Sequence, residues 1–134
     1  MNALIADNPQ VIVVATTNFP ELIDESLIRS GRFDLRFDIP RPDRAARAQI
    51  LTRMIRDLIT AHESTAFRMF ADDVEPDALA AAGDSLTGAD LREVLRRAQL
   101  DKAMTEARTG RPSDPINQAD LLARIADVRT ALGR

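Results

Sequence analysis

Residues 15–43 read ATTNFPELIDESLIRSGRFDLRFDIPRPD, and their hydrophobic pattern decides the fold. Within this stretch, residues 33–39 (FDLRFDI) alternate between apolar and charged side chains, which predicts a strand with one buried face. Just upstream, residues 10–17 (QVIVVATT) form a β-branched run without alternation, which is typical of a strand buried on both faces of a parallel sheet. Between the two strands we expect a short helix that Asp24 caps and Gly31 ends.

From residue 43 onward the apolar period becomes that of a helix and stays so. The first predicted helix follows Pro42 and carries an apolar stripe opposite a basic side. The stripe consists of Ile50, Leu51, Met54, Ile55, Leu58 and Ile59, and the basic side of Arg44, Arg47, Arg53 and Arg56. We therefore expect the stripe to be buried and these arginines to face solvent. Residues 62–75 then form a polar linker, which Phe67 and Phe70 anchor to the core.

Capping signals divide the remainder into three more helices. Pro76 opens a short helix that ends at Gly83. A T-x-x-D capping box at Thr87 begins a long helix that Gly110 ends, and Asn117 with Asp120 caps the last helix. Their expected core residues are Leu91, Val94, Leu95 and Ala98, followed by Leu121, Leu122, Ile125, Val128 and Leu132. The sequence thus predicts an α+β fold, mostly α, in which two strands precede four helices.

Composition excludes several classes of protein. The absence of cysteine excludes disulfides, thiolate metal sites and cysteine nucleophiles. A net charge of −3 and the absence of Trp and Tyr argue against a nucleic-acid surface. No apolar run approaches the roughly 20 residues of a membrane span, and His62 lacks the partners that a metal site needs. We expect a cytoplasmic protein with no membrane contact and no nucleic-acid partner.

Residues 15–43 resemble the second region of homology of the classical AAA family of ATPases. The shared pattern is a strand ending in T-N, followed by I-D-x-S-L-x-R-x-G-R-F-D at matching spacing. Residues 86–98 (LTGADLREVLRRA) resemble the helical C-terminal lid of that family, so the resemblance covers about 11–132. It implies two domains. Residues 1–42 are expected to be the C-terminal remnant of the nucleotide-binding core, and residues 43–134 the lid.

The resemblance also implies roles for individual residues. Asn18 stands at the carboxyl end of a strand, where doubly wound sheets bind ligands, and matches the sensor residue that positions water at the γ-phosphate. Arg29 and Arg32 match arginine fingers offered to ATP on a neighbouring subunit, a task that suits a planar and always charged guanidinium. Gly88 and Ala89 match the lid element beside the adenine. Met54 stands where many members have a histidine against the nucleotide.

Two motifs of a complete ATPase are missing from the sequence. A P-loop needs G-x-x-x-x-G-K-[ST], but the only lysine is Lys102, inside a predicted helix without nearby glycines. Residues 22–25 (LIDE) mimic a Walker B acid pair but lack the preceding long apolar strand. We therefore expect a piece of a hexameric ATPase whose upstream part holds ATP and Mg²⁺. The chain alone should bind neither and should be inactive.

The resemblance implies neighbouring AAA subunits and a protein client as partners. A freestanding lid-like module that binds other ATPase subunits without nucleotide chemistry remains an alternative, and an upstream P-loop in the same reading frame would eliminate it. A helical nucleic-acid-binding domain that uses the face from Arg44 to Arg56 is a weaker alternative.

In the parent sheet the P-loop strand separates the two strands of this chain. We therefore expect residues 10–17 to be covered by strand exchange in a dimer or by repacking against helices.

Overall fold

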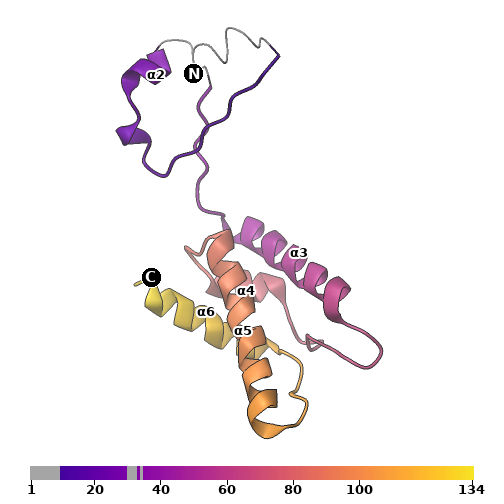
Figure 1. Cartoon of the computed structure of the whole chain (residues 1–134). Coiled ribbons are helices and arrows are strands. Elements are labelled where there is room, and N and C mark those ends of the chain that lie inside the picture. The colour runs from indigo at the N-terminus through magenta and orange to yellow at the C-terminus, as the bar shows by residue number, and fades with distance from the viewer. Residues whose placement is uncertain (1–9, 30–32, 34) are drawn as a thin grey trace. The chain divides into compact units, whose positions relative to one another are not determined.

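The structure is a computed structural model that describes residues 10–29, 33 and 35–134. The chain divides into two compact units, Met1–Ile39 and Pro40–Arg134, each of which is described by itself. The described residues are mostly helical, as the sequence predicts (Figure 1). None of the helices in this described part combines the length and apolar character that a bilayer crossing demands.

The first unit contains the 3₁₀-helix η1 (Pro20–Leu22) and the short helix α2 (Glu25–Arg29). Asp24 precedes α2, and its Oδ1 accepts a hydrogen bond from the backbone N–H of Ser26 at 2.9 Å. The predicted cap is thereby confirmed. The predicted stop at Gly31 lies outside the described residues.

The two predicted strands do not form in the described part of the first unit. Residues 11–17 and the described residues of 33–39 carry no strand assignment. Most of their apolar side chains face solvent, with Ile12 88% and Ile39 91% exposed. A strand exists only when a neighbouring strand accepts and donates its backbone hydrogen bonds, and the described residues contain no such neighbour for either segment.

The second unit contains the four predicted helices: α3 (Arg44–His62), α4 (Pro76–Ala82), α5 (Gly88–Thr109) and α6 (Gln118–Ala131). Asp43 caps α3, and both capping boxes, at Thr87 and Asn117, are present. Gly110 ends α5 at φ 68°, a left-handed conformation that glycine adopts without steric cost. The helical part of the fold was therefore predictable from local signals.

One hydrophobic core joins the four helices. The contacting pairs are α3 with α4 and α5, and α6 with α4 and α5. The buried apolar residues are Leu51, Ile55, Phe70, Leu79, Ala80, Leu86, Leu91, Val94, Leu95, Ala98, Ile116, Leu121, Ile125 and Val128. The stripe of α3 is confirmed: two of its residues are buried and the other four pack against the core. Leu122 of α6 and Leu132, the residue directly after α6, do not belong to the core, because their side chains are 38% and 43% exposed.

Hydrogen bonds hold the middle of the linker from α3 to α4. Glu63 Oε1 accepts hydrogen bonds from the backbone N–H groups of Met69 at 2.9 Å and Phe70 at 3.1 Å. Phe70 is buried and forms an isolated parallel bridge with Ile116, the residue that precedes the cap of α6. The predicted anchor at Phe70 is confirmed. Phe67 is not an anchor, because its side chain is 46% exposed.

Candidate functional site

Arg29 is the last residue of α2 and presents its guanidinium to solvent. Its Nη2 lies 2.8 Å from the Glu25 carboxylate one turn earlier, and both side chains are more than 70% exposed. An exposed pair of this kind contributes only about 0–1 kcal/mol, so an incoming phosphate could replace Glu25 at little cost. Upstream, Asp24 caps the helix through its hydrogen bond from Ser26, and this bond lowers the pKa of the Asp24 carboxyl. Arg29 is thus an accessible cation on a capped helix.

Asn18 is exposed and follows a segment without strand hydrogen bonds. The hydroxyl of Thr17 accepts a hydrogen bond from the backbone N–H of Phe19 at 3.0 Å, which turns the chain at Asn18. The amide of Asn18 is therefore accessible to a ligand. Arg32, the second predicted finger, lies outside the described residues, so the predicted pair of arginines stays a prediction.

The N-terminus of α5 carries the predicted adenine contact. Thr87 and Asp90 satisfy each other's backbone N–H groups, which leaves Gly88 and Ala89 in the first turn. A Cβ at Gly88 would meet no atom within 4 Å, and Ala89 is exposed, so this turn is open to an approaching flat group. Burial opposes the charge on Asp90, but hydrogen bonds from the N–H and hydroxyl of Thr87, with Arg134 and Arg41 nearby, keep its pKa below the ordinary value.

Met54, the remaining predicted contact, lies in the middle of α3. Its side chain is half-buried and packs against the core that α3 shares with α4 and α5. Asn18 and Arg29 belong to the first unit, whereas Met54, Gly88 and Ala89 belong to the second. The candidate site is therefore described as two separate sets of residues.

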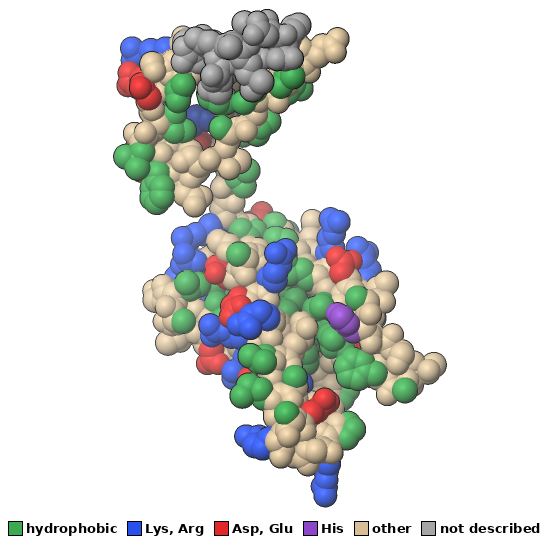
Figure 2. Space-filling model, in the orientation of Figure 1, with side chains coloured by type: hydrophobic (Ala, Val, Ile, Leu, Met, Phe, Trp, Pro, Cys, Tyr) green, Lys and Arg blue, Asp and Glu red, His purple; other side chains and the backbone are tan. Residues whose placement is uncertain are grey.

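The residues that could imitate an ATPase centre have other partners. Lys102 lies in the middle of α5, and its ammonium pairs with the carboxylate of Asp120 on α6 at 2.8 Å. In the Walker B mimic, Asp24 caps α2 and Glu25 pairs with Arg29. The described residues contain no group of three or more potential metal ligands. His62 ends α3 and is exposed, on a face where basic and acidic side chains are interspersed (Figure 2).

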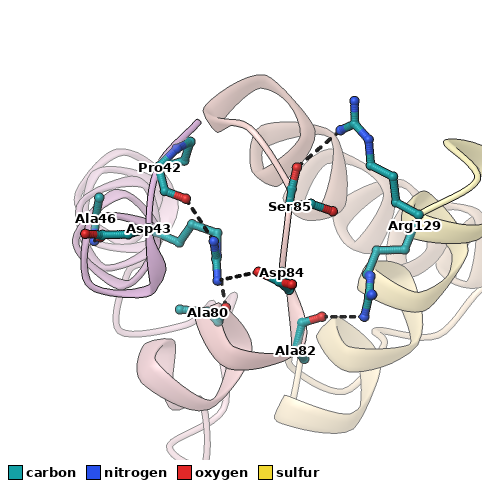
Figure 3. A network of polar contacts seen from close by, with 10 residues as sticks. Pro42, Asp43, Ala46, Ala80, Ala82, Asp84, Ser85 and Arg129 are labelled. Atoms are coloured by element: carbon teal, nitrogen blue, oxygen red, sulfur yellow. Dashed lines mark hydrogen bonds and ion pairs between the residues drawn. The ribbon is translucent and has the colours of Figure 1, made fainter. Parts of the chain in front are cut away.

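From the sequence, Arg47 was not predicted to be buried and hydrogen-bonded. It was expected on the solvent side of α3, yet it is only 5% exposed. Its guanidinium donates to the carbonyl oxygens of Ala80 and Pro42 and lies 3.5 Å from Asp84 (Figure 3). The signal was present in the spacing, since Arg47 stands four residues before Leu51 and eight before Ile55, on the same helix face.

Known proteins resemble this chain in both units. Residues 1–41 match the family described as ATPase family associated with various cellular activities (AAA). Over 111 residues, or 83% of this chain, it is 41% identical to the ATP-dependent zinc metalloprotease FtsH 3 of Sphaerobacter thermophilus. Over 110 residues, or 78% of the chain, it is 33% identical to the human ATP-dependent zinc metalloprotease YME1L1. The chain spans 19% of the first relative's length and 13% of the second's.

These similarities agree with the motifs quoted above. The family match covers the sensor and arginine motifs, and the alignments to the relatives cover far more of the chain than these motifs do. The chain therefore belongs to the AAA family of ATPases, as a segment from the C-terminal part of the family's ATPase module.

Proposed function

We propose that this chain completes the ATPase module of a hexameric AAA protein that couples ATP hydrolysis to the unfolding or remodelling of a protein client. Residues 1–42 would then be the end of the nucleotide-binding core, and residues 43–134 the lid. The observation that carries the proposal is the sequence 15–43, which keeps Asn18, Arg29 and Arg32 in the family's register directly before a helical domain.

In this proposal Arg29 and Arg32 act on ATP bound to the neighbouring subunit. Phosphoryl transfer accumulates negative charge on the γ-phosphate oxygens, and a guanidinium supplies matched donors without itself reacting. The solvent exposure of Arg29 supports this role, because a finger must leave its own subunit's surface and reach another molecule. Asn18 would hold the attacking water through its amide.

The lid would contact the base of the nucleotide. The open first turn of α5 supports a contact with adenine at Gly88 and Ala89, because a Cβ at Gly88 would meet no atom within 4 Å apart from its own turn of helix. Met54 would add an apolar contact from α3 in place of the histidine found in many relatives. Its half-buried position in the core of the second unit allows only part of its side chain to reach a ligand.

ATP and Mg²⁺ would be held mainly by parts of the full-length protein other than this chain. Phosphates need a cradle of backbone N–H groups with a lysine, and Lys102 is engaged by Asp120 instead. The relatives are named ATP-dependent zinc metalloproteases, which suggests that the parent ATPase delivers its client to a peptidase. The described residues do not fit a zinc site, so no proteolytic step is assigned to them.

The partners in this proposal are identical AAA subunits in a ring, together with an unfolded segment of the client. We place the assembly in the cytoplasm, and we propose no contact with nucleic acid. Two of the four arginines on α3 are already engaged, because Arg44 pairs with Asp77 and Arg47 is buried. This arrangement weighs against the nucleic-acid-binding alternative.

The proposal is tested in the full-length ATPase that carries this segment. Arg29→Ala and Arg32→Ala should each lower kcat for ATP hydrolysis by roughly 10³-fold, while ATP affinity changes little, because the contact forms mainly in the transition state. Arg36→Ala is the matched control, since Arg36 is an exposed arginine of the same unit that pairs with Asp38. Loss of ATP affinity in isolated monomers of the Arg29 or Arg32 variants would contradict the role in trans.

A further inference from the structure

The guanidinium of Arg47 joins three segments of the second unit. Its Nη1 donates to the carbonyl oxygen of Pro42 at 2.8 Å, and its Nε donates to that of Ala80 at 3.0 Å. Its Nη2 lies 3.5 Å from the carboxylate of Asp84 (Figure 3). One buried side chain thus connects the segment at the start of the second unit, the last turn of α4 and the loop after α4.

That loop, residues 83–87, leads from α4 into α5, and two further arginines contact the loop and the end of α4. Arg129 of α6 donates to the carbonyl oxygen of Ala82 at 3.1 Å, and Arg134 donates to that of Ser85 at 3.3 Å. Ser85 adopts φ 64°, a left-handed conformation that is unusual for a residue with a side chain. Arg47 and Arg129 therefore bond carbonyl groups in the last turn of α4, which lack partners within the helix, and Arg134 bonds the turn at Ser85.

The same loop sets the position of the open turn of α5. Thr87 ends the loop and caps α5, so Gly88 and Ala89 follow it directly. At the other end of the network, Pro42 lies three residues after Ile39, the last residue of the first unit. Arg47 is the one side chain of this network that contacts both the entry segment at Pro42 and the α4 end of the loop.

We infer that Arg47 is a positioning residue that couples the entry segment at Pro42 to the α5 turn at Gly88 and Ala89. The guanidinium is planar and presents its donors in a fixed fork, so it holds two carbonyl groups at a set separation. A shift at Pro42 must then move the end of α4 or break a buried hydrogen bond. The nucleotide part of this inference rests on the proposed function, because it assumes that the α5 turn contacts ATP.

Replacing Arg47 by lysine tests the coupling while the positive charge of the side chain is kept. In Arg47→Lys a single ammonium replaces the fork, and it cannot span Pro42 and the α4 end together. Arg47→Met removes the charge and both hydrogen bonds while filling much of the volume. Arg53→Met is the matched control, because Arg53 lies on the same helix and is exposed.

The first measurement is the backbone amide spectrum of the ¹⁵N-labelled 134-residue chain. Arg47→Lys should shift or broaden the amide signals of both Asp43 and the Gly88–Ala89 turn while helical circular dichroism is kept, and Arg53→Met should change neither. If Arg47 served packing alone, changes would stay at α3 and Ala80, and that result would overturn the inference. Should Arg47→Met fail to fold, Arg47→Lys still decides the question.

The second measurement is the KM for ATP in the full-length ATPase. Arg47→Lys should raise this KM by about three- to tenfold with a smaller change in kcat, because a misplaced contact weakens binding. Gly88→Leu tests the nucleotide contact at the turn directly. A Cβ at this position meets no atom within 4 Å, so the added side chain should occupy the space of the ligand without disturbing the fold. If Gly88→Leu raises KM and Arg47→Lys does not, the coupling is wrong. If neither changes KM, the proposed nucleotide contact at the turn fails.

Discussion

Two adjacent leucines of α6 offer a sharp test of the core of the second unit. Leu121 is fully buried and belongs to the core cluster, whereas Leu122 is 38% exposed. The same substitution, leucine to alanine, changes helix propensity equally at both positions. Any difference between Leu121→Ala and Leu122→Ala therefore reports packing.

The expected magnitudes follow from burial. Removing a fully buried leucine loses its transfer free energy and leaves a cavity, so Leu121→Ala should lower the free energy of unfolding by about 2–5 kcal/mol. Leu122→Ala removes a side chain that already meets water and leaves no enclosed cavity, so about 1 kcal/mol is expected. For a unit of this size, each 1 kcal/mol lowers Tm by roughly 4–8 °C.

The assay is urea denaturation of the 134-residue chain followed by far-ultraviolet circular dichroism. Leu121→Ala should shift the midpoint strongly and Leu122→Ala slightly, with the same dependence of free energy on urea in both variants. Equal losses at the two positions, or a larger loss for Leu122→Ala, would refute the packing of α6 described above.

Three further predictions concern the two units. Residues 43–134 alone should melt cooperatively with helical circular dichroism, because the whole core cluster lies within them, and a featureless melt would show dependence on the first unit. The free energy of unfolding should fall as the pH drops below about 4, because the folded pKa values of Asp90 and Asp120 lie below their unfolded values. The stability that these carboxylates add above their unfolded pKa is therefore lost as the pH falls through their folded pKa. The double variant Asp90→Asn, Asp120→Asn should show a smaller fall in urea titrations across this range. Light scattering at several concentrations should detect association of the chain through residues 10–17, and Val13→Lys should weaken that association. A chain that stays monomeric on dilution, with this segment ordered and unpaired, would rule out strand exchange.

The helices were predictable because their signals are local. A capping box places its donors and acceptors within three residues, so Thr87 with Asp90 and Asn117 with Asp120 mark the starts of α5 and α6 without tertiary information. Leu122 shows the limit of periodicity. It lies one position, about 100° of helix, from Leu121, and only the packing of α4 and α5 against α6 decides which side is buried.

The strands were less predictable from one chain because their stability is not local. The β-branched run at 10–17 indicates a preference for pairing, but a strand forms only beside another strand. The candidate site has the same limit. Asn18, Arg29 and Arg32 follow from the family's register, yet the ATP that Arg29 and Arg32 are proposed to contact would be bound by another subunit. Arg47 was missed because it was grouped with Arg44, Arg53 and Arg56 on the solvent side of α3, although its spacing from Leu51 and Ile55 places it on the core face.

The central claim is that Arg29 acts on ATP held by a neighbouring subunit, and subunit mixing tests it most directly. Full-length subunits with Arg29→Ala are mixed at varied ratios with subunits that lack the Walker B acid, each inactive alone. ATP hydrolysis should reappear in the mixture, because some interfaces join an intact Arg29 to an intact Walker B site. Absence of hydrolysis at every ratio, with mixed rings shown to form, would contradict the claim.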